Sequence, residues 1–233
     1  MVYAAADYGG GAVIGQAACG TLFPMPVQNR VTPFGDRITT PARGTLTGNR
    51  GCLHDERGEF RRRWTTRAWI CCLLEFRGRH RPIMPPGRWT ALFFLDEATG
   101  FAAGHRPCGE CRNADYRRFK KAWCEGNDGD VAAPVRLIDE RLHAERTARP
   151  RATWQASLDR LPDGTMWLGD DGVWIVAGER IARWTPSGYR DIGTRPRRRD
   201  VSVLTPSSLV SSFSAGYRPM LHSTLEDRNR ASS

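Results

Sequence analysis

Residues 96–116 read DEATGFAAGHRPCGECRNADY and set a Cys-x-x-C pair between two segments of helical character. The first segment, 95–103, has an aspartate near its start that can cap a helix and a glycine directly after it that can end one. The second segment, 108–126, repeats aromatic residues three and four positions apart, which indicates one buried helical face. The cysteine pair therefore lies where one predicted helix stops and the next begins.

A second copy of this junction occurs near the C-terminus. FAAGHRPC at 101–108 resembles FSAGYRPM at 213–220, and the second copy contains no cysteine. We expect Gly104 to adopt the left-handed conformation and Pro107 to prevent the helix from resuming. The glycine and proline are thus explained by a helix stop, and the cysteines are what distinguishes the first copy.

The segments before the junction predict short strands. Residues 31–60 are dense in Gly, Pro, Thr and Arg, which favours short strands joined by ordered loops. Residues 63–76 and 88–94 are rich in aromatic and β-favouring residues and are predicted as strands. Three prolines make 78–87 a loop.

The segments after the junction change from helix to strand. Residues 134–148 predict a third helix, and 165–193 alternate around an Asp-Gly pair that favours a hairpin. A strand, VSVLT, follows, with Thr205 as the N-cap of a last helix. Three tryptophans are expected on one face of the hairpin sheet: Trp167, Trp174 and Trp184.

Together these segments predict an α+β fold. It has short strands and ordered loops, a central helical segment carrying a CxxC zinc site, and a β-hairpin-rich C-terminal part. We expect a flexible leader over 1–27, one domain over 28–222 and a disordered tail over 223–233. Within the domain, 28–150 forms the zinc-binding and helical part and 151–222 the β-rich part.

The net charge of +10 favours an acidic partner, and DNA is the partner we expect. No apolar run approaches the ~20 residues that a membrane span needs. The chain has seven cysteines, an odd number, and its first residues lack the charged start of a secretory signal. A cytoplasmic location and free thiols are therefore predicted. We also expect a monomer.

In a reducing compartment, Cys108 and Cys111 indicate a metal site or a redox pair. Thioredoxin-like proteins place such a pair just after a strand, whereas a helix precedes it here, so Zn²⁺ is the predicted cofactor. A complete zinc site needs two further ligands.

A zinc deaminase is one reading of this pair. Its signature is His-x-Glu followed by Pro-Cys-x-x-Cys, with the glutamate moving protons. His54 and Glu56 have the required order but lie in a segment that reads as a turn. His143 and Glu145 lie in a predicted helix but follow the cysteines.

A second reading comes from residues 93–115, FFLDEATGFAAGHRPCGECRNAD. This stretch resembles the zinc-binding domain of the Ada family of DNA alkylation-repair proteins. That domain combines a strand ending in aromatic residues, a short helix, and a Gly–aromatic–Arg-Pro-Cys-x-x-Cys-Arg run; His105 stands at the aromatic position here. The resemblance covers roughly a tenth of the chain.

The resemblance implies a zinc bound by four cysteines in a module that contacts DNA. By analogy, Cys71 and Cys72 on the upstream strand are the remaining ligands. The family has a Cys-x-x-x-Cys pair there, whereas adjacent residues on a strand point to opposite faces, so one of the two is expected to miss the metal. Cys52, His54 and His143 are the alternatives for the fourth ligand.

These observations predict a zinc-containing DNA-binding enzyme that repairs or processes damaged or modified DNA by hydrolytic base excision, as a glycosylase does. The alternatives are a zinc-dependent nucleobase or nucleoside deaminase and a non-catalytic zinc-stabilised DNA-binding protein. Carboxylates beside histidines can activate water. The candidate catalytic residues are Asp36, His54, Glu56, His143 and Glu145. The candidate DNA-binding residues are Arg43, Asn49, Arg50, Arg197 and Arg198.

Overall fold

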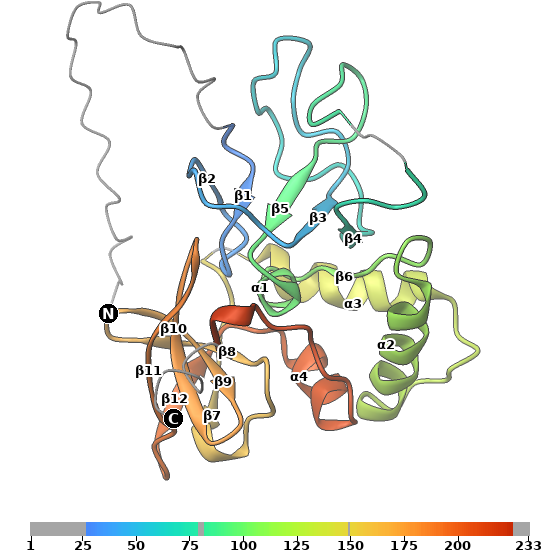
Figure 1. The fold of residues 1–233 in the computed structure, drawn as a ribbon. Coiled ribbons are helices and arrows are strands. Elements are labelled where there is room, and N and C mark those ends of the chain that lie inside the picture. The colour runs from blue at the N-terminus through green and yellow to red at the C-terminus, as the bar shows by residue number, and fades with distance from the viewer. Residues whose placement is uncertain (1–26, 79–81, 149, 226–233) are drawn as a thin grey trace, which may run out of the picture.

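The computed structural model describes residues 27–78, 82–148 and 150–225 (Figure 1). The predicted leader, up to residue 26, lies outside the described residues, as do 226–233 of the predicted tail. The described part is α+β, as predicted, with two six-stranded sheets and four α-helices. No helix in this part is long and apolar enough to cross a membrane.

The first sheet consists of short strands from the N-terminal half. Its spatial order is β2-β1-β5-β3-β4-β6. The strands are β1 (Arg30–Val31), β2 (Arg37–Ile38), β3 (Leu46–Asn49), β4 (Ile70–Leu73), β5 (Leu92–Phe94) and β6 (Arg106–Pro107). The two strands predicted over 63–76 and 88–94 are shorter than expected. In the first case the chain turns, because the amides of Thr65 and Thr66 both donate to the Arg50 carbonyl.

The second sheet is antiparallel throughout and has the order β11-β10-β9-β8-β12-β7. The strands are β7 (Trp154–Ser157), β8 (Met166–Gly169), β9 (Gly172–Ala177), β10 (Arg180–Thr185), β11 (Gly188–Thr194) and β12 (Asp200–Val203). The predicted hairpin is confirmed, since Gly169 pairs with Gly172 across the turn.

The expectation that three tryptophans share one face of this sheet is wrong for Trp184. Trp167 and Trp174 are paired across β8 and β9, with ring centroids 6.1 Å apart. Trp174 is opposite Arg183 on β10, so the next residue, Trp184, points to the other face. There its indole N–H donates to Thr99 at 3.1 Å, which joins this face of the sheet to the first helix.

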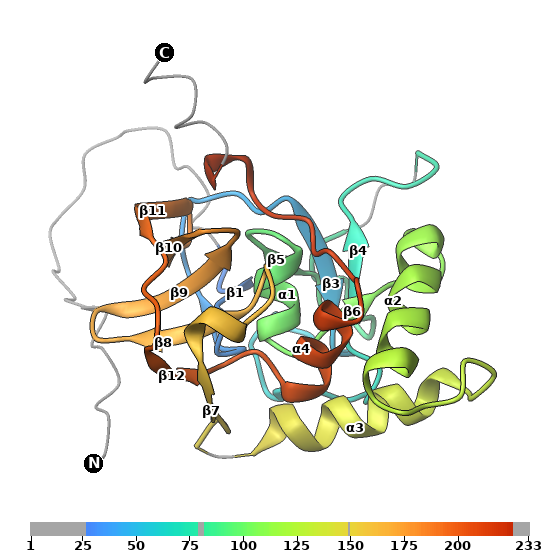
Figure 2. The ribbon, with the colours of Figure 1, turned by 90° about the horizontal axis from the view of Figure 1, so that it is seen from below.

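The helices are α1 (Glu97–Ala102), α2 (Asn113–Gly126), α3 (Val135–Thr147) and α4 (Ser207–Ser214). Helix α1 lies between the two sheets, and α4 lies beside it (Figures 1 and 2). Asp96 caps α1 as predicted, accepting from the Thr99 amide at 2.9 Å. Helix α2 starts five residues later than predicted, so the cysteine pair lies in the turn before it.

The repeated helix stop is present in both copies. Gly104 and Gly216 have φ of 84° and 102°. The amide of His105 donates to Gly100, and that of Tyr217 donates to Ser212, which is the same five-residue closure. The two copies also pack against each other, with the Phe101 and Phe213 ring centroids 5.2 Å apart.

Two buried carboxylates connect α1 to the C-terminal segment. Asp96 accepts from the Tyr189 hydroxyl at 2.7 Å and from the His222 amide at 3.0 Å. Glu97 accepts from the Tyr217 hydroxyl and from the Met220 amide, both at 2.8 Å. Leu225, beyond the predicted boundary at 222, is also buried in a core cluster with residues of the second sheet.

Candidate metal centre

Three cysteines form a compact group of thiols. The Sγ atoms of Cys72, Cys108 and Cys111 all lie within 4.8 Å of one another, and all three residues are buried. Tetrahedral zinc with Zn–S bonds of ~2.3 Å needs sulfurs about 3.8 Å apart, so small side-chain movements would close the site around a metal. Within the described residues, no further His, Cys, Asp or Glu ligand atom joins this group. The group could hold a metal ion.

The pairing of β4 with β6 brings the thiols together. The two strands run parallel, with Cys71 opposite Pro107, and the Cys108 amide donates to the Cys71 carbonyl at 2.9 Å. The chain then turns back, with the Arg112 amide donating to the Cys108 carbonyl at 3.2 Å. This turn carries Cys111 to the side of β4 on which Cys72 lies.

Cys71, also predicted as a ligand, lies outside the thiol group. Its side chain points to the opposite face of β4 and packs in a core cluster with Leu46 and Phe94. A Cβ atom added to Gly100 would come within 2.5 Å of the Cys71 Sγ, so the glycine leaves room for this thiol. Burial raises the pKa of Cys71, which keeps it a neutral thiol.

Hydrogen bonds and burial give the three thiols different pKa values. A hydrogen bond from the Cys72 thiol lowers the pKa of Cys108 to about 5, and the backbone amides of Cys111 and Glu110 act in the same direction. The same hydrogen bond, together with burial, raises the pKa of Cys72. Burial raises the pKa of Cys111. Without metal, Cys108 is therefore the thiolate of the group.

An ion-pair network holds the end of the cysteine turn. Arg112 directly follows Cys111, and its guanidinium lies 2.6 Å from Glu97 of α1 and 2.8 Å from Asp115 of α2. Both Arg112 and Glu97 are buried. The turn is thus fixed to two helices, which positions Cys111 beside Cys108.

The first His-x-Glu pair does not reach the thiols. His54 is buried, with Nδ1 2.6 Å from the Thr90 hydroxyl and Nε2 3.2 Å from the Pro85 carbonyl. Because a carbonyl only accepts, Nε2 carries the proton and Nδ1 accepts from threonine. Glu56 is exposed. This histidine therefore holds a loop in place.

The second pair also has structural partners. The His143 ring lies edge-on to Trp64, with centroids 4.6 Å apart, and burial lowers its pKa. Glu145 accepts from the Ser208 hydroxyl at 2.6 Å and from the Ser208 amide at 3.3 Å. Glu145 therefore caps α4, in place of the predicted cap Thr205, whose hydroxyl accepts from the Met166 amide. Asp36, the fifth predicted catalytic residue, is exposed.

The predicted DNA-binding residues are found in different environments. Arg43, Arg197 and Arg198 are exposed, as DNA contacts require. Asn49 is half-buried and accepts from the Gly51 amide at 3.2 Å. Arg50 is only 2% exposed, so it is not an open surface contact.

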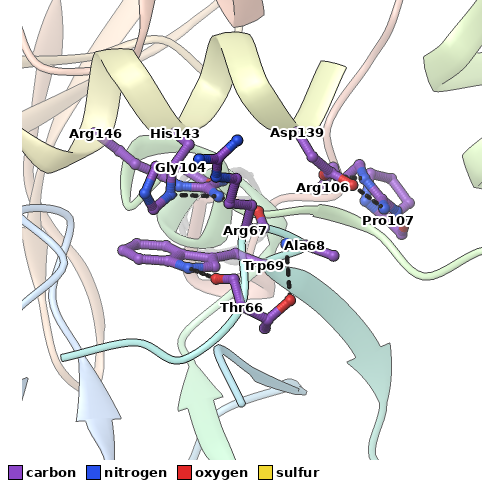
Figure 3. Close-up of polar contacts among 10 residues, drawn as sticks. All are labelled: Thr66, Arg67, Ala68, Trp69, Gly104, Arg106, Pro107, Asp139, His143 and Arg146. Atoms are coloured by element: carbon purple, nitrogen blue, oxygen red, sulfur yellow. Dashed lines mark hydrogen bonds and ion pairs between the residues drawn. The ribbon is translucent and has the colours of Figure 1, made fainter. Parts of the chain in front are cut away.

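Sequence reasoning missed two buried arginines of the helical region. Arg106 forms a bidentate ion pair with Asp139 of α3, at 2.7 and 2.8 Å. Arg146 of α3 packs over Trp69, with 4.1 Å between the guanidinium carbon and the ring centroid (Figure 3). One signal was available, since Arg146 stands four residues after Leu142 and so shares its buried helical face.

The chain matches no family model, and neither the curated proteins nor the solved structures contain a significant match to it.

Proposed function

We propose that this chain is a zinc-containing DNA-binding protein in which Cys72, Cys108 and Cys111 hold the zinc in a structural role. The observation that carries the proposal is the group of three buried sulfurs within 4.8 Å of one another. Sulfur ligands at this separation favour zinc over the hard cations, which prefer oxygen. The charge of +10 and the resemblance of 93–115 to the Ada zinc domain support DNA as the partner.

A structural role is favoured by the surroundings of the thiols. A catalytic zinc keeps an open position next to substrate, with an acid or base in reach. Here the three cysteines are buried and pack against Ile70 and Phe76. His54 and Glu145, the best-placed members of the two His-x-Glu pairs, are occupied elsewhere. These observations disfavour a deaminase.

Base excision was the reaction predicted from the sequence. Its five candidate residues do not form one group: His54, His143 and Glu145 have separate partners, and Asp36 and Glu56 are exposed. The proposal is therefore confined to zinc binding and DNA binding. Base excision would be tested by a separate glycosylase assay on duplexes with modified bases.

The zinc proposal is tested on the full chain purified without added metal. Elemental analysis should give about one zinc per chain, and X-ray absorption should show at least three sulfurs in the first shell. A metal-free yet stably folded protein, or a first shell of nitrogen and oxygen, would overturn it.

The DNA proposal is tested by fluorescence anisotropy with a labelled duplex over a range of salt concentrations. We expect binding that weakens steeply and linearly in a plot of log affinity against log salt, because bound arginines release counterions. Absence of binding at low salt would overturn the proposal. Removing zinc with a chelator should abolish binding by unfolding the cysteine turn, and circular dichroism measures that loss directly.

A further inference from the structure

Arginines surround Trp69 in the interior of the molecule. Arg50 and Arg146 are each 2% exposed, and the guanidinium carbon of each lies 4.1 Å from the Trp69 ring centroid. Figure 3 shows Arg146 and His143 projecting from α3 toward this ring. Arg151, which follows α3, donates to the carbonyl of Ala102 at 2.6 Å, so it lies at the C-terminal end of α1.

The hydrogen-bond partners of these arginines are neutral. Arg50 donates to the Gly35 carbonyl at 2.8 Å and to His105 Nε2 at 3.2 Å. Arg146 donates to the carbonyls of Gly104 and Arg67. The described residues offer Arg50, Arg146 and Arg151 no carboxylate within 4.0 Å. Buried positive charge usually has an anionic partner in direct contact, whereas Asp139 and Glu145 act on Arg146 and Arg151 only from beyond that distance. Arg50, the most deeply placed of the three, has no carboxylate that opposes its neighbouring arginines.

Several buried N–H groups of this cluster have no acceptor. They are Arg50 Nη2, Arg146 Nε, Arg151 Nε, Arg37 Nε and His105 Nδ1. Since His105 accepts from Arg50 through Nε2, its Nδ1 carries a proton that also lacks a partner. Buried donors in native proteins are nearly always satisfied, so a group of five indicates a missing acceptor.

One open donor, Arg50 Nη2, faces the turn between β1 and β2. A Cβ atom added to Gly35 would lie 3.5 Å from Arg50 Nη2, so this nitrogen lies directly under the turn. At the outer edge, Arg37 stacks 4.0 Å from the Phe60 ring centroid and donates to the Arg62 carbonyl at 3.4 Å. The half-buried Arg37 and Arg151 therefore connect the buried Arg50 to the surface.

Electrostatics supports the same grouping. Burial, followed by repulsion from neighbouring arginines, lowers the pKa of Arg37 and Arg50, and burial lowers that of Arg151 to about 10. Arg63 repels all three groups; Asp36 opposes this at Arg37, and Glu145, followed by Asp36, opposes it at Arg151. Asp36 is exposed, so it compensates the buried charge weakly.

We propose that Arg37, Arg50 and Arg151 form a binding site for a phosphoryl group beneath the turn that contains Gly35. A carboxylate can be satisfied by the two parallel N–H groups of one arginine, whereas a tetrahedral phosphoryl group presents an oxygen to each of several guanidinium groups. Free phosphate and the terminal phosphate of a nucleic-acid strand share this chemistry. If the ligand is the end of a nucleic-acid strand, this site rests on the proposed DNA binding. If the ligand is free phosphate, it does not, because the site is separate from the thiols.

The aromatic residue Trp64 offers a way to distinguish a phosphorylated nucleic-acid strand from inorganic phosphate as the ligand. Trp64 is 41% exposed and follows Arg63 in the chain. An exposed indole can stack on a base next to a terminal phosphate but offers nothing to inorganic phosphate. Trp64→Leu should therefore weaken binding of a phosphorylated strand and leave inorganic phosphate unchanged.

The test is calorimetric titration of the zinc-loaded full chain with inorganic phosphate, against chloride at equal ionic strength. We expect saturable binding, and Arg37→Met and Arg151→Met should each weaken it at least about tenfold. Arg190→Met, an exposed arginine on β11, removes the same charge and should change the affinity less than about twofold. Both test residues are half-buried, and circular dichroism confirms that the variants fold.

Short oligonucleotides with a 5′-phosphate or a 5′-hydroxyl form the second arm. If only the phosphorylated strand displaces inorganic phosphate, the strand end is the ligand; if neither strand displaces it, free phosphate is. No saturable phosphate binding by the wild type, or equal losses in Arg151→Met and Arg190→Met, would overturn the site. Such a result leaves zinc content and salt-dependent duplex binding as independent measures of the proposed function.

Discussion

The backbone amide of Cys108 donates a hydrogen bond to the carbonyl of Cys71 at 2.9 Å. This contact sets the cysteine turn against β4 and thereby decides which of two adjacent cysteines faces it. Cys72 points toward Cys108 and Cys111, and Cys71 points into the core. Chemically identical side chains one position apart thus have different roles.

The first prediction compares these neighbours. Cys72→Ser should lose the zinc and about 3 kcal/mol or more of the free energy of unfolding, because metal binding contributes directly to folding. Cys71→Ser should retain about one zinc and lose about 1–3 kcal/mol, the cost of burying a hydroxyl without a partner. Elemental analysis and urea unfolding measure both. Equal zinc loss in the two variants would contradict the assignment.

The second prediction concerns the pH dependence of metal affinity. A hydrogen bond from Cys72 lowers the pKa of Cys108 to about 5, while the pKa values of Cys72 and Cys111 are raised. At neutral pH, metal must therefore displace protons from Cys72 and Cys111 and none from Cys108. Apparent zinc affinity should rise with pH by about a hundredfold per unit, with two protons released.

Competition with a chromophoric chelator at several pH values gives this slope. Cys124→Ser, which removes a thiol outside the metal group, should leave it unchanged. A slope of three protons would mean that Cys108 is protonated in the metal-free protein.

The third prediction concerns the buried pair of Arg112 and Glu97, 2.6 Å apart. Arg112→Met leaves a carboxylate buried without its cation and should cost about 3–5 kcal/mol at neutral pH. Arg118→Met removes an exposed arginine of α2, which pairs with the same Asp115, and should cost less than about 1 kcal/mol. Urea unfolding of the two variants makes the comparison.

The stability of the Arg112→Met variant should change with pH in a defined direction. Burial raises the pKa of Glu97 above its ordinary value of 4.5, and losing Arg112, which opposes this, raises it further. The folded state then binds more protons than the unfolded state, so stability falls as pH rises from about 4.5 through the folded pKa. Arg112→Met should therefore recover stability on acidification within this window. Equal losses at all pH values would show that Glu97 is not the cause.

The fourth prediction separates a capping role from a catalytic role for Glu145. Glu145→Ala removes the acceptor for the Ser208 amide and hydroxyl and should cost about 1–2 kcal/mol. Glu140→Ala on the same helix, where the side chain is exposed, should cost less than about 0.5 kcal/mol. Thermal unfolding compares the stability of the two variants. We expect both variants to retain DNA binding.

Local patterns predicted the elements whose causes are local. The Asp96 cap, the left-handed Gly104 and the hairpin signalled by Asp171-Gly172 depend on a few neighbouring residues, and all three are present. The choice between Cys71 and Cys72 could not be made from alternation alone, because it depends on the register of β4 against β6.

The roles of the predicted catalytic residues also depend on partners that are distant in the sequence. His54 and Glu145 have the chemical character of acid–base groups, but Thr90 and Ser208, which engage them, lie 36 and 63 residues away. Arg146 was missed and Arg50 was assigned to the DNA-binding surface because charged residues are expected at the surface, whereas both guanidinium groups are buried against Trp69.

The buried carboxylates at the start of α1 also bear on where the chain can be divided. Asp96 and Glu97 have partners close in sequence, Thr99 and Arg112. They also accept hydrogen bonds from donors 93 to 126 residues further along the chain: Tyr189, Tyr217, Met220 and His222. A fragment that ends before these donors would leave part of the hydrogen-bonding capacity of both buried acids unused, so we expect the cysteine-containing half to be less stable when it is expressed by itself.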